Sequence, residues 1–112
     1  MARLAAGVMV SALIRAAEQA GGSAMVLAKG DATAGGILLL TIDRGRNPRF
    51  LERGLGPDGK PALIASGPAA LADDAEATEY WRRRRSRDSD LWVIELDIPW
   101  AERFAAETMG LG

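Results

Sequence analysis

The sequence predicts an α+β fold: one compact domain in which a mixed β-sheet carries two main helices and a short C-terminal helix. Short apolar segments alternate with turns rich in Gly, Pro and Asp, which is typical of strands. Two other segments place apolar residues at helical spacing. The 112 residues fit one domain, so residues 1–112 are expected to fold as a single unit. The expected order is strand, helix, four strands, helix and strand, followed by the short helix.

The first two elements are predicted from residues 4–20. Residues 4–10, LAAGVMV, are small and apolar, and we expect a short strand there. Ser11 has a side chain suited to the N-cap of the helix that follows. Gly21 and Gly22 come directly after the last helical position, where a chain commonly needs a left-handed residue. This pair therefore predicts the end of the first helix.

Four strands are expected in the middle of the chain. They are residues 23–29, 37–42, 49–54 and 61–66. The second, ILLLTI, is apolar at nearly every position, which suits a central strand covered on both faces. Pro57-Asp58-Gly59 is strong turn chemistry and predicts a hairpin between the last two. Pro61 has no N–H for a neighbouring strand, so it favours the start of a strand or an edge strand.

The second helix and the last strand are predicted from residues 73–98. Asp73 and Glu76 have the spacing of a capping box, and acidic residues precede arginines in the order that the helix dipole favours. Residues 91–98 then alternate, with Trp92 among the apolar residues of one face. Pro99 ends this strand, and the following residues can form a short amphipathic helix.

Composition excludes several classes of function. The chain has no Cys and no His, which excludes cysteine or histidine zinc sites, thiol nucleophiles and histidine bases. The formal net charge of −1 gives no general attraction for nucleic acid. No apolar stretch reaches the length that a membrane span needs. We therefore expect a cytoplasmic protein that does not enter a membrane, and the sequence predicts no cofactor.

An arginine run at residues 82–85, followed by Arg87, is the most unusual feature of the sequence. A site for nucleic acid or a phosphorylated ligand would use Arg82, Arg83, Arg85 and Arg87. Successive helical residues point about 100° apart, so consecutive arginines cannot line one stripe. Neighbouring acidic residues and Trp81, expected to stack on the arginine three or four positions later, answer much of the charge. The sequence therefore favours a charged helix end over a phosphate-binding surface.

Two weaker candidate sites follow the arginines. Glu95 and Asp97 lie two apart on the last strand and project from one face, so they could hold Mg²⁺ in a metal-dependent hydrolase. The favoured interpretation is a charged strand that resists aggregation, and no metal site is predicted. Trp100 and Phe104, four residues apart, are the candidates for a self-association surface.

Two blocks of the sequence resemble a known family. Residues 10–39 and residues 87–97, RDSDLWVIELD, are similar to domain of unknown function family 1491, a group of small alphaproteobacterial proteins. The family often has a proline between the two aspartates of the second block, where this chain has Ser89. The resemblance covers nearly the whole chain and implies a compact cytoplasmic domain with no assigned reaction.

Three functions remain at this stage, in a fixed order of preference. The first is a non-catalytic module that binds a protein partner, including a second copy of itself. The second is binding of nucleic acid or a phosphorylated ligand by the arginine cluster, and the third is the metal-dependent hydrolase. The sequence assigns no reaction, partner, strand order or oligomeric state.

Overall fold

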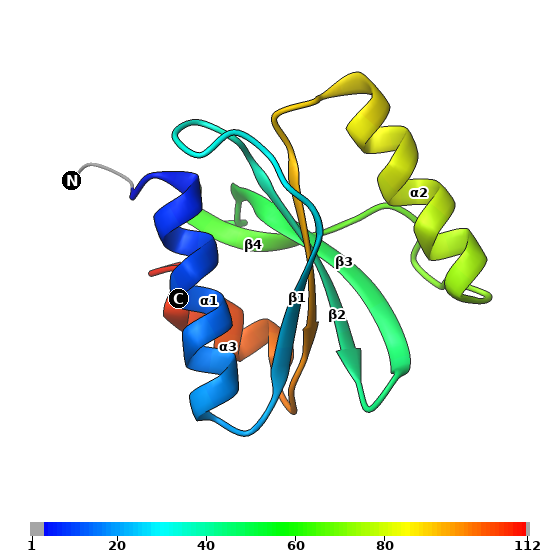
Figure 1. The fold of residues 1–112 in the computed structure, drawn as a ribbon, viewed down its shortest axis with the longest axis horizontal. Helices are drawn as coiled ribbons and strands as arrows, with labels where there is room; N and C mark the ends of the chain where they lie inside the picture. Colours follow the sequence, from blue (N-terminus) through cyan, green and yellow to red (C-terminus); the bar gives the residue numbers. More distant parts are fainter. Residues whose placement is uncertain (1–3, 112) are drawn as a thin grey trace.

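The structure is a computed structural model that describes residues 4–111, and it contains five strands and three helices (Figure 1). In chain order the elements are α1 (Ala6–Gln19), β1 (Ser23–Ala28), β2 (Ile37–Asp43), β3 (Arg46–Leu55), β4 (Pro61–Ser66), α2 (Asp74–Arg87), β5 (Trp92–Asp97) and α3 (Ala101–Thr108). The predicted α+β class, the mixed sheet and the short C-terminal helix are confirmed.

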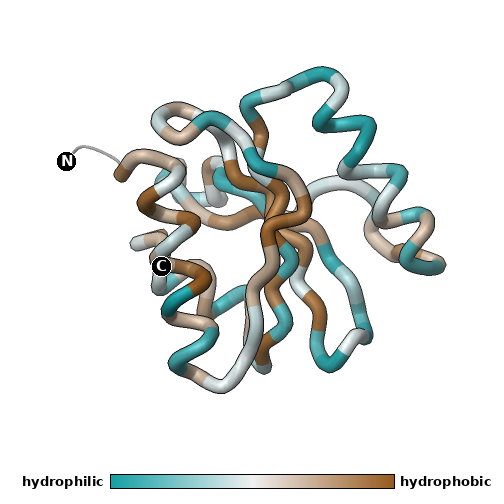
Figure 2. Tube along the Cα trace, viewed as in Figure 1, coloured by the Kyte–Doolittle hydropathy of each residue, from teal (hydrophilic) through white to brown (hydrophobic). Residues whose placement is uncertain are grey.

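The five strands form one sheet in the order β1-β5-β2-β3-β4. β5 runs parallel to β2, and the other neighbours are antiparallel. α1 and α3 cover one face, and α2 lies on the other (Figure 1). The apolar side chains of β2 and β5 therefore alternate between two core layers, which explains why these strands are apolar at nearly every position (Figure 2).

The strand predicted at residues 4–10 is wrong, because this segment is the first half of α1. The buried positions of α1 are Ala6, Val10, Leu13 and Ala17, a spacing of four, three and four that continues across the predicted boundary. The helical period was present in the sequence. It was hidden because the intervening residues are also small or apolar, so the segment shows no polar face before Ser11.

α1 begins without a side-chain cap, which is why Ser11 is not its N-cap. Instead, the N–H groups of Ala6 and Gly7 donate to backbone carbonyls in the loop between β1 and β2. The C-terminal end is as predicted: Gly21 has φ 84°, and Gly22 N–H donates to the carbonyl of Ala17. These bonds make a Schellman motif, which satisfies carbonyls at the end of the helix.

The predicted β3–β4 hairpin is confirmed and has a defined turn. Gly59 N–H donates to Gly56 O at 2.9 Å, and Gly56 N–H donates to Lys60 O at 2.9 Å. Gly59 has φ 77°, a left-handed conformation that glycine adopts without strain. This turn fixes which residues of β4 face β3 and which face outward.

α2 is the most polar helix, and Ala77 is its one fully buried residue (Figure 2). The predicted cap is present, since Glu76 N–H donates to Asp73 Oδ1 at 2.9 Å. Large side chains join α2 to the sheet: Tyr80 packs on Phe50 of β3 with ring centroids 4.7 Å apart. No helix within residues 4–111 is long and apolar enough to cross a membrane.

Candidate functional site

The arginine run is divided by its environment, and Arg84 is a structural residue. Its Nη1 and Nη2 donate to the Glu52 carboxylate of β3 at 2.6 and 2.9 Å, in a bidentate ion pair. Nη1 also lies 3.0 Å from the Tyr80 hydroxyl and 3.2 Å from Ser66 Oγ. The hydrogen bond from Arg84 holds the pKa of Glu52 below its usual value, against the opposing effect of burial. Arg84 therefore fixes α2 to the sheet.

The four arginines predicted as ligand contacts do not form one surface. Arg85 is half-buried and donates to the carbonyls of Ser89 and Lys29, at 2.6 and 3.1 Å. Arg82, Arg83 and Arg87 are exposed. The guanidinium over Trp81 belongs to Arg82 at 5.6 Å, while Arg84 lies over Tyr80, so the expected stacking of Trp81 on a later arginine is not found. The cluster leaves only part of its charge available to a ligand.

Glu95 and Asp97 are half-buried on β5. Asp97 Oδ1 accepts a hydrogen bond from Arg44 N–H at 2.9 Å, which ties the β2–β3 turn to the end of β5. Within residues 4–111, no group of three or more His, Cys, Asp or Glu side chains is placed to hold a metal ion. Asp97 thus has a structural role that the sequence pattern did not predict.

Trp100 and Phe104 point to different environments. Trp100 is 84% exposed, the largest value among the large hydrophobic residues, whereas Phe104 is half-buried against the core beneath α3. The difference arises because Trp100 precedes α3 in a left-handed conformation with φ 59°. The four-residue spacing of a helix therefore does not align its side chain with Phe104.

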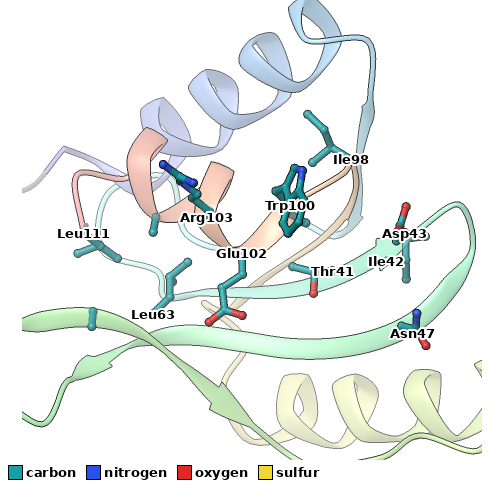
Figure 3. Close-up of a pocket in the computed structure, with 13 residues that line it drawn as sticks. Thr41, Ile42, Asp43, Asn47, Leu63, Ile98, Trp100, Glu102, Arg103 and Leu111 are labelled. Carbon is teal, nitrogen blue, oxygen red and sulfur yellow. The ribbon is translucent and has the colours of Figure 1, made fainter.

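A groove of about 580 Å³ lies between α3 and the sheet, with Trp100 on its wall (Figure 3). Its apolar lining is Ala62, Leu63, Ile98, Ala101, Ala106 and Leu111. Asp43 and Asn47 lie at the end formed by the β2–β3 turn, and Leu63 and Leu111 lie at the other (Figure 3). An open apolar groove with a few polar groups at its rim is the usual form of a binding site.

Backbone strain is concentrated at this groove. Among residues 4–111 the non-glycine residues with positive φ are Arg44, Asn47 and Trp100. Two of them line the groove, and the third is held by Asp97 beside it. Such a conformation costs about 1–3 kcal/mol for a residue other than glycine, and it is found disproportionately at functional sites. The bulky tryptophan is the most informative of the three, because nothing in its exposure compensates the strain.

The charges at the rim are unequally satisfied. Glu102 pairs with Arg49 at 2.8 Å, and Arg103 contacts Glu107 at 3.3 Å. Within the described part of the chain, Asp43 makes no ion pair. A ligand in the groove would therefore meet one carboxylate without a charged partner, next to Trp100 and an apolar floor.

Comparison with known proteins identifies the family. The family model described as "Protein of unknown function (DUF1491)" matches residues 4–106. The chain belongs to the DUF1491 family. The resemblance read from residues 10–39 and 87–97 is thereby confirmed, and this domain has the fold of that family.

Three solved structures are similar to this DUF1491 domain. A crystal structure of a DUF1491 protein from Caulobacter crescentus is 30% identical with a TM-score of 0.76, covering 91% of this chain and 94% of that one. An NMR structure of a DUF1491 protein from the same species is 31% identical, with a TM-score of 0.71 and 87% of each chain covered. The solution structure of a protein from A. tumefaciens is 28% identical, with a TM-score of 0.68 and 87% of each covered. No similarity to a protein of curated function is found.

The groove of this DUF1491 domain was only partly visible in the sequence. Trp100 was predicted as an interaction residue, but its partners in the groove come from β2, β4 and α3, which only folding brings together. One local signal was available: Trp100 follows Pro99 at the junction between a strand and a helix. Proline at such a junction predicts a turn, in which an aromatic side chain can be left facing solvent.

Proposed function

We propose that this DUF1491 protein is a cytoplasmic, non-catalytic binding module that holds a short segment of a protein partner in the groove beside α3. The observation that carries the proposal is Trp100, which is 84% exposed in a strained backbone conformation on the groove wall. Tryptophan is among the residues that contribute most to protein interfaces, and an exposed one is suited to become buried on binding.

The lining defines the chemistry of the partner. Ile98 and Leu63 belong to an apolar floor that would accept one aliphatic or aromatic side chain beside Trp100. Asp43 is a carboxylate without an ion pair at one end of the groove. We therefore propose a segment in which a basic residue lies next to the apolar one, so that the two contacts form together.

The test uses labelled synthetic pentapeptides and fluorescence anisotropy. Peptides with a central Leu or Phe flanked by Lys should bind the whole chain, and the same peptides flanked by Glu should bind more weakly. Trp100→Ala should weaken binding by at least about tenfold. Met25→Ala is the matched control, because Met25 is 59% exposed on β1, outside the groove lining, and its loss should change nothing. Equal binding by the wild type and Trp100→Ala would remove the groove from the proposal.

A second candidate function rests on Arg83 and Arg87, which are exposed and lie one turn apart on α2. Such a pair could contact consecutive phosphates of a nucleic acid. Fewer observations support it, because Arg84 and Arg85 are engaged within the fold and Glu79 lies 4.0 Å from Arg83. Binding to a labelled oligonucleotide that falls steeply with salt and is lost in Arg83→Ala/Arg87→Ala would favour this function.

A further inference from the structure

The outer edge of β4 is an unprotected strand edge. β4 is the last strand of the sheet and pairs only with β3. Its sequence, PALIAS, contains no charged residue, and its pairing with β3 has no bulge. Proteins usually protect an edge strand with charge, an internal proline or a bulge, because its free backbone groups can pair with another chain. Here Pro61 protects only the beginning of the strand.

The turn determines which backbone groups are free. Gly56 and Lys60 share a hydrogen bond across the hairpin. Because hydrogen-bonded pairs alternate along an antiparallel ladder, Ala62, Ile64 and Ser66 face β3, whereas Leu63 and Ala65 face outward. No hydrogen bond from another described element reaches β4 on that side. Leu63 and Ala65 therefore each present an N–H and a C=O without a partner in the chain.

The opposite edge of the sheet is built differently. β1 has an irregularity between Val26 and Ala28 where its register with β5 shifts. Lys29 follows this strand directly, and its carbonyl is occupied by Arg85. A shift of register and a terminal positive charge are devices that oppose pairing of an edge with another strand. The two edges thus differ in protection, although Val26 and Ile64 are each 38% exposed.

We infer that β4 pairs in antiparallel fashion with β4 of a second copy of this chain, extending the sheet across a twofold axis. The register that matches the free groups pairs Leu63 of one copy with Ala65 of the other, so that all their N–H and C=O groups are satisfied. This register places Ile64 on the axis opposite its own copy, where pairing covers its exposed side chain. A copy of β4 brings no like charge to the contact. The inference is independent of the Trp100 groove.

The mass of the chain in solution tests this inference. Sedimentation equilibrium should give twice the chain mass of 11.9 kDa at high concentration. Ile64→Lys should give a monomer, because it places two like charges on the axis. Ala65→Pro should do the same by removing an outward N–H that β3 does not use, so the hairpin is kept. Val26→Lys is the matched control on β1 and should remain a dimer.

Several results would overturn the inference. One is a monomer mass for the wild type at every concentration up to about 1 mM. Another is a dimer that persists in both folded variants, because the contact would then lie elsewhere. If circular dichroism shows that a variant is unfolded, amide exchange of the wild type decides instead. Leu63 and Ala65 amides should exchange fast at low concentration and slowly in the dimer, and unchanged exchange would refute the pairing.

Discussion

The ion pair between Arg84 and Glu52 gives the most specific stability prediction. Arg84→Met keeps most of the side-chain volume but removes two charge-assisted hydrogen bonds to Glu52, as well as the contact with the Tyr80 hydroxyl. A hydrogen bond to a charged group contributes about 1.5–3 kcal/mol. Both side chains are about 30% exposed, 31% and 27%, so solvent reduces the sum. We expect a loss of about 2 kcal/mol in the free energy of unfolding.

Urea denaturation followed by circular dichroism measures this loss directly. The matched control is Arg83→Met, one position earlier, where the guanidinium is exposed and 4.0 Å from Glu79. An exposed pair of this kind contributes less than about 0.5 kcal/mol, so the control should be nearly neutral. If Arg84→Met and Arg83→Met unfold at the same urea concentration, the proposed role of Arg84 in fixing α2 is refuted.

The same pair predicts a dependence on pH. The hydrogen bond from Arg84 lowers the pKa of Glu52 in the folded chain below its ordinary value of 4.5. A carboxylate with a lowered folded pKa contributes stability that is complete above the unfolded pKa and is lost as the pH falls through the folded one. The difference in stability between the wild type and Glu52→Gln should therefore be constant near neutral pH and shrink below about pH 4.5. A difference that grows on acidification would contradict the direction of this shift.

Three further predictions concern local geometry, each read by urea or thermal denaturation. Asp73→Ala removes the acceptor for Glu76 N–H and should cost about 1 kcal/mol, whereas retained stability would show that this cap is unimportant. Gly35→Ala should destabilise strongly, because a Cβ there would lie 2.1 Å from the Asp90 carbonyl oxygen; a neutral result would mean that this loop can shift. Trp100→Gly should raise stability by about 1 kcal/mol by relieving the left-handed strain while weakening peptide binding, and a loss of stability would refute the strain.

Local chemistry made much of the fold predictable. The capping residue Asp73 and the turn at Pro57-Asp58-Gly59 act over a few residues, and both elements are found where the sequence places them. The alternation that includes Trp92 in β5 was also sufficient, because both faces of this strand are covered. The error at residues 4–10 arose where small apolar residues fit either period, and packing against the loop between β1 and β2 decided for the helix.

Contacts between distant segments could not be predicted. Glu52 and Arg84 are separated by 32 residues, and the sequence offered nearer acidic partners for the arginine run. The sequence gave no strand order, so it could not show that β4 forms an edge. Trp100 was predicted as an interaction residue, but its separation from Phe104 depends on one left-handed backbone conformation.

The groove and the β4 edge are distinct surfaces with different chemistry. The groove combines an exposed indole with an apolar floor and the carboxylate of Asp43. The edge offers backbone groups without charge. A dimer formed through β4 would present two copies of the groove, and two linked sites bind a partner with repeated segments more tightly than one site does. The two experiments separate these functions, because Trp100 variants leave β4 intact.

The most direct measurement for the groove is an NMR titration of the ¹⁵N-labelled chain with the Lys-flanked pentapeptides. If they bind as proposed, the indole N–H signal of Trp100 and the backbone signals of Leu63 and Ile98 shift together, while those of Trp81 and Met25 stay in place. The same titration of Trp100→Ala should show no coordinated shift at peptide concentrations up to about 1 mM. Shifts confined to α2, or no shift in the wild type, would contradict binding in the groove.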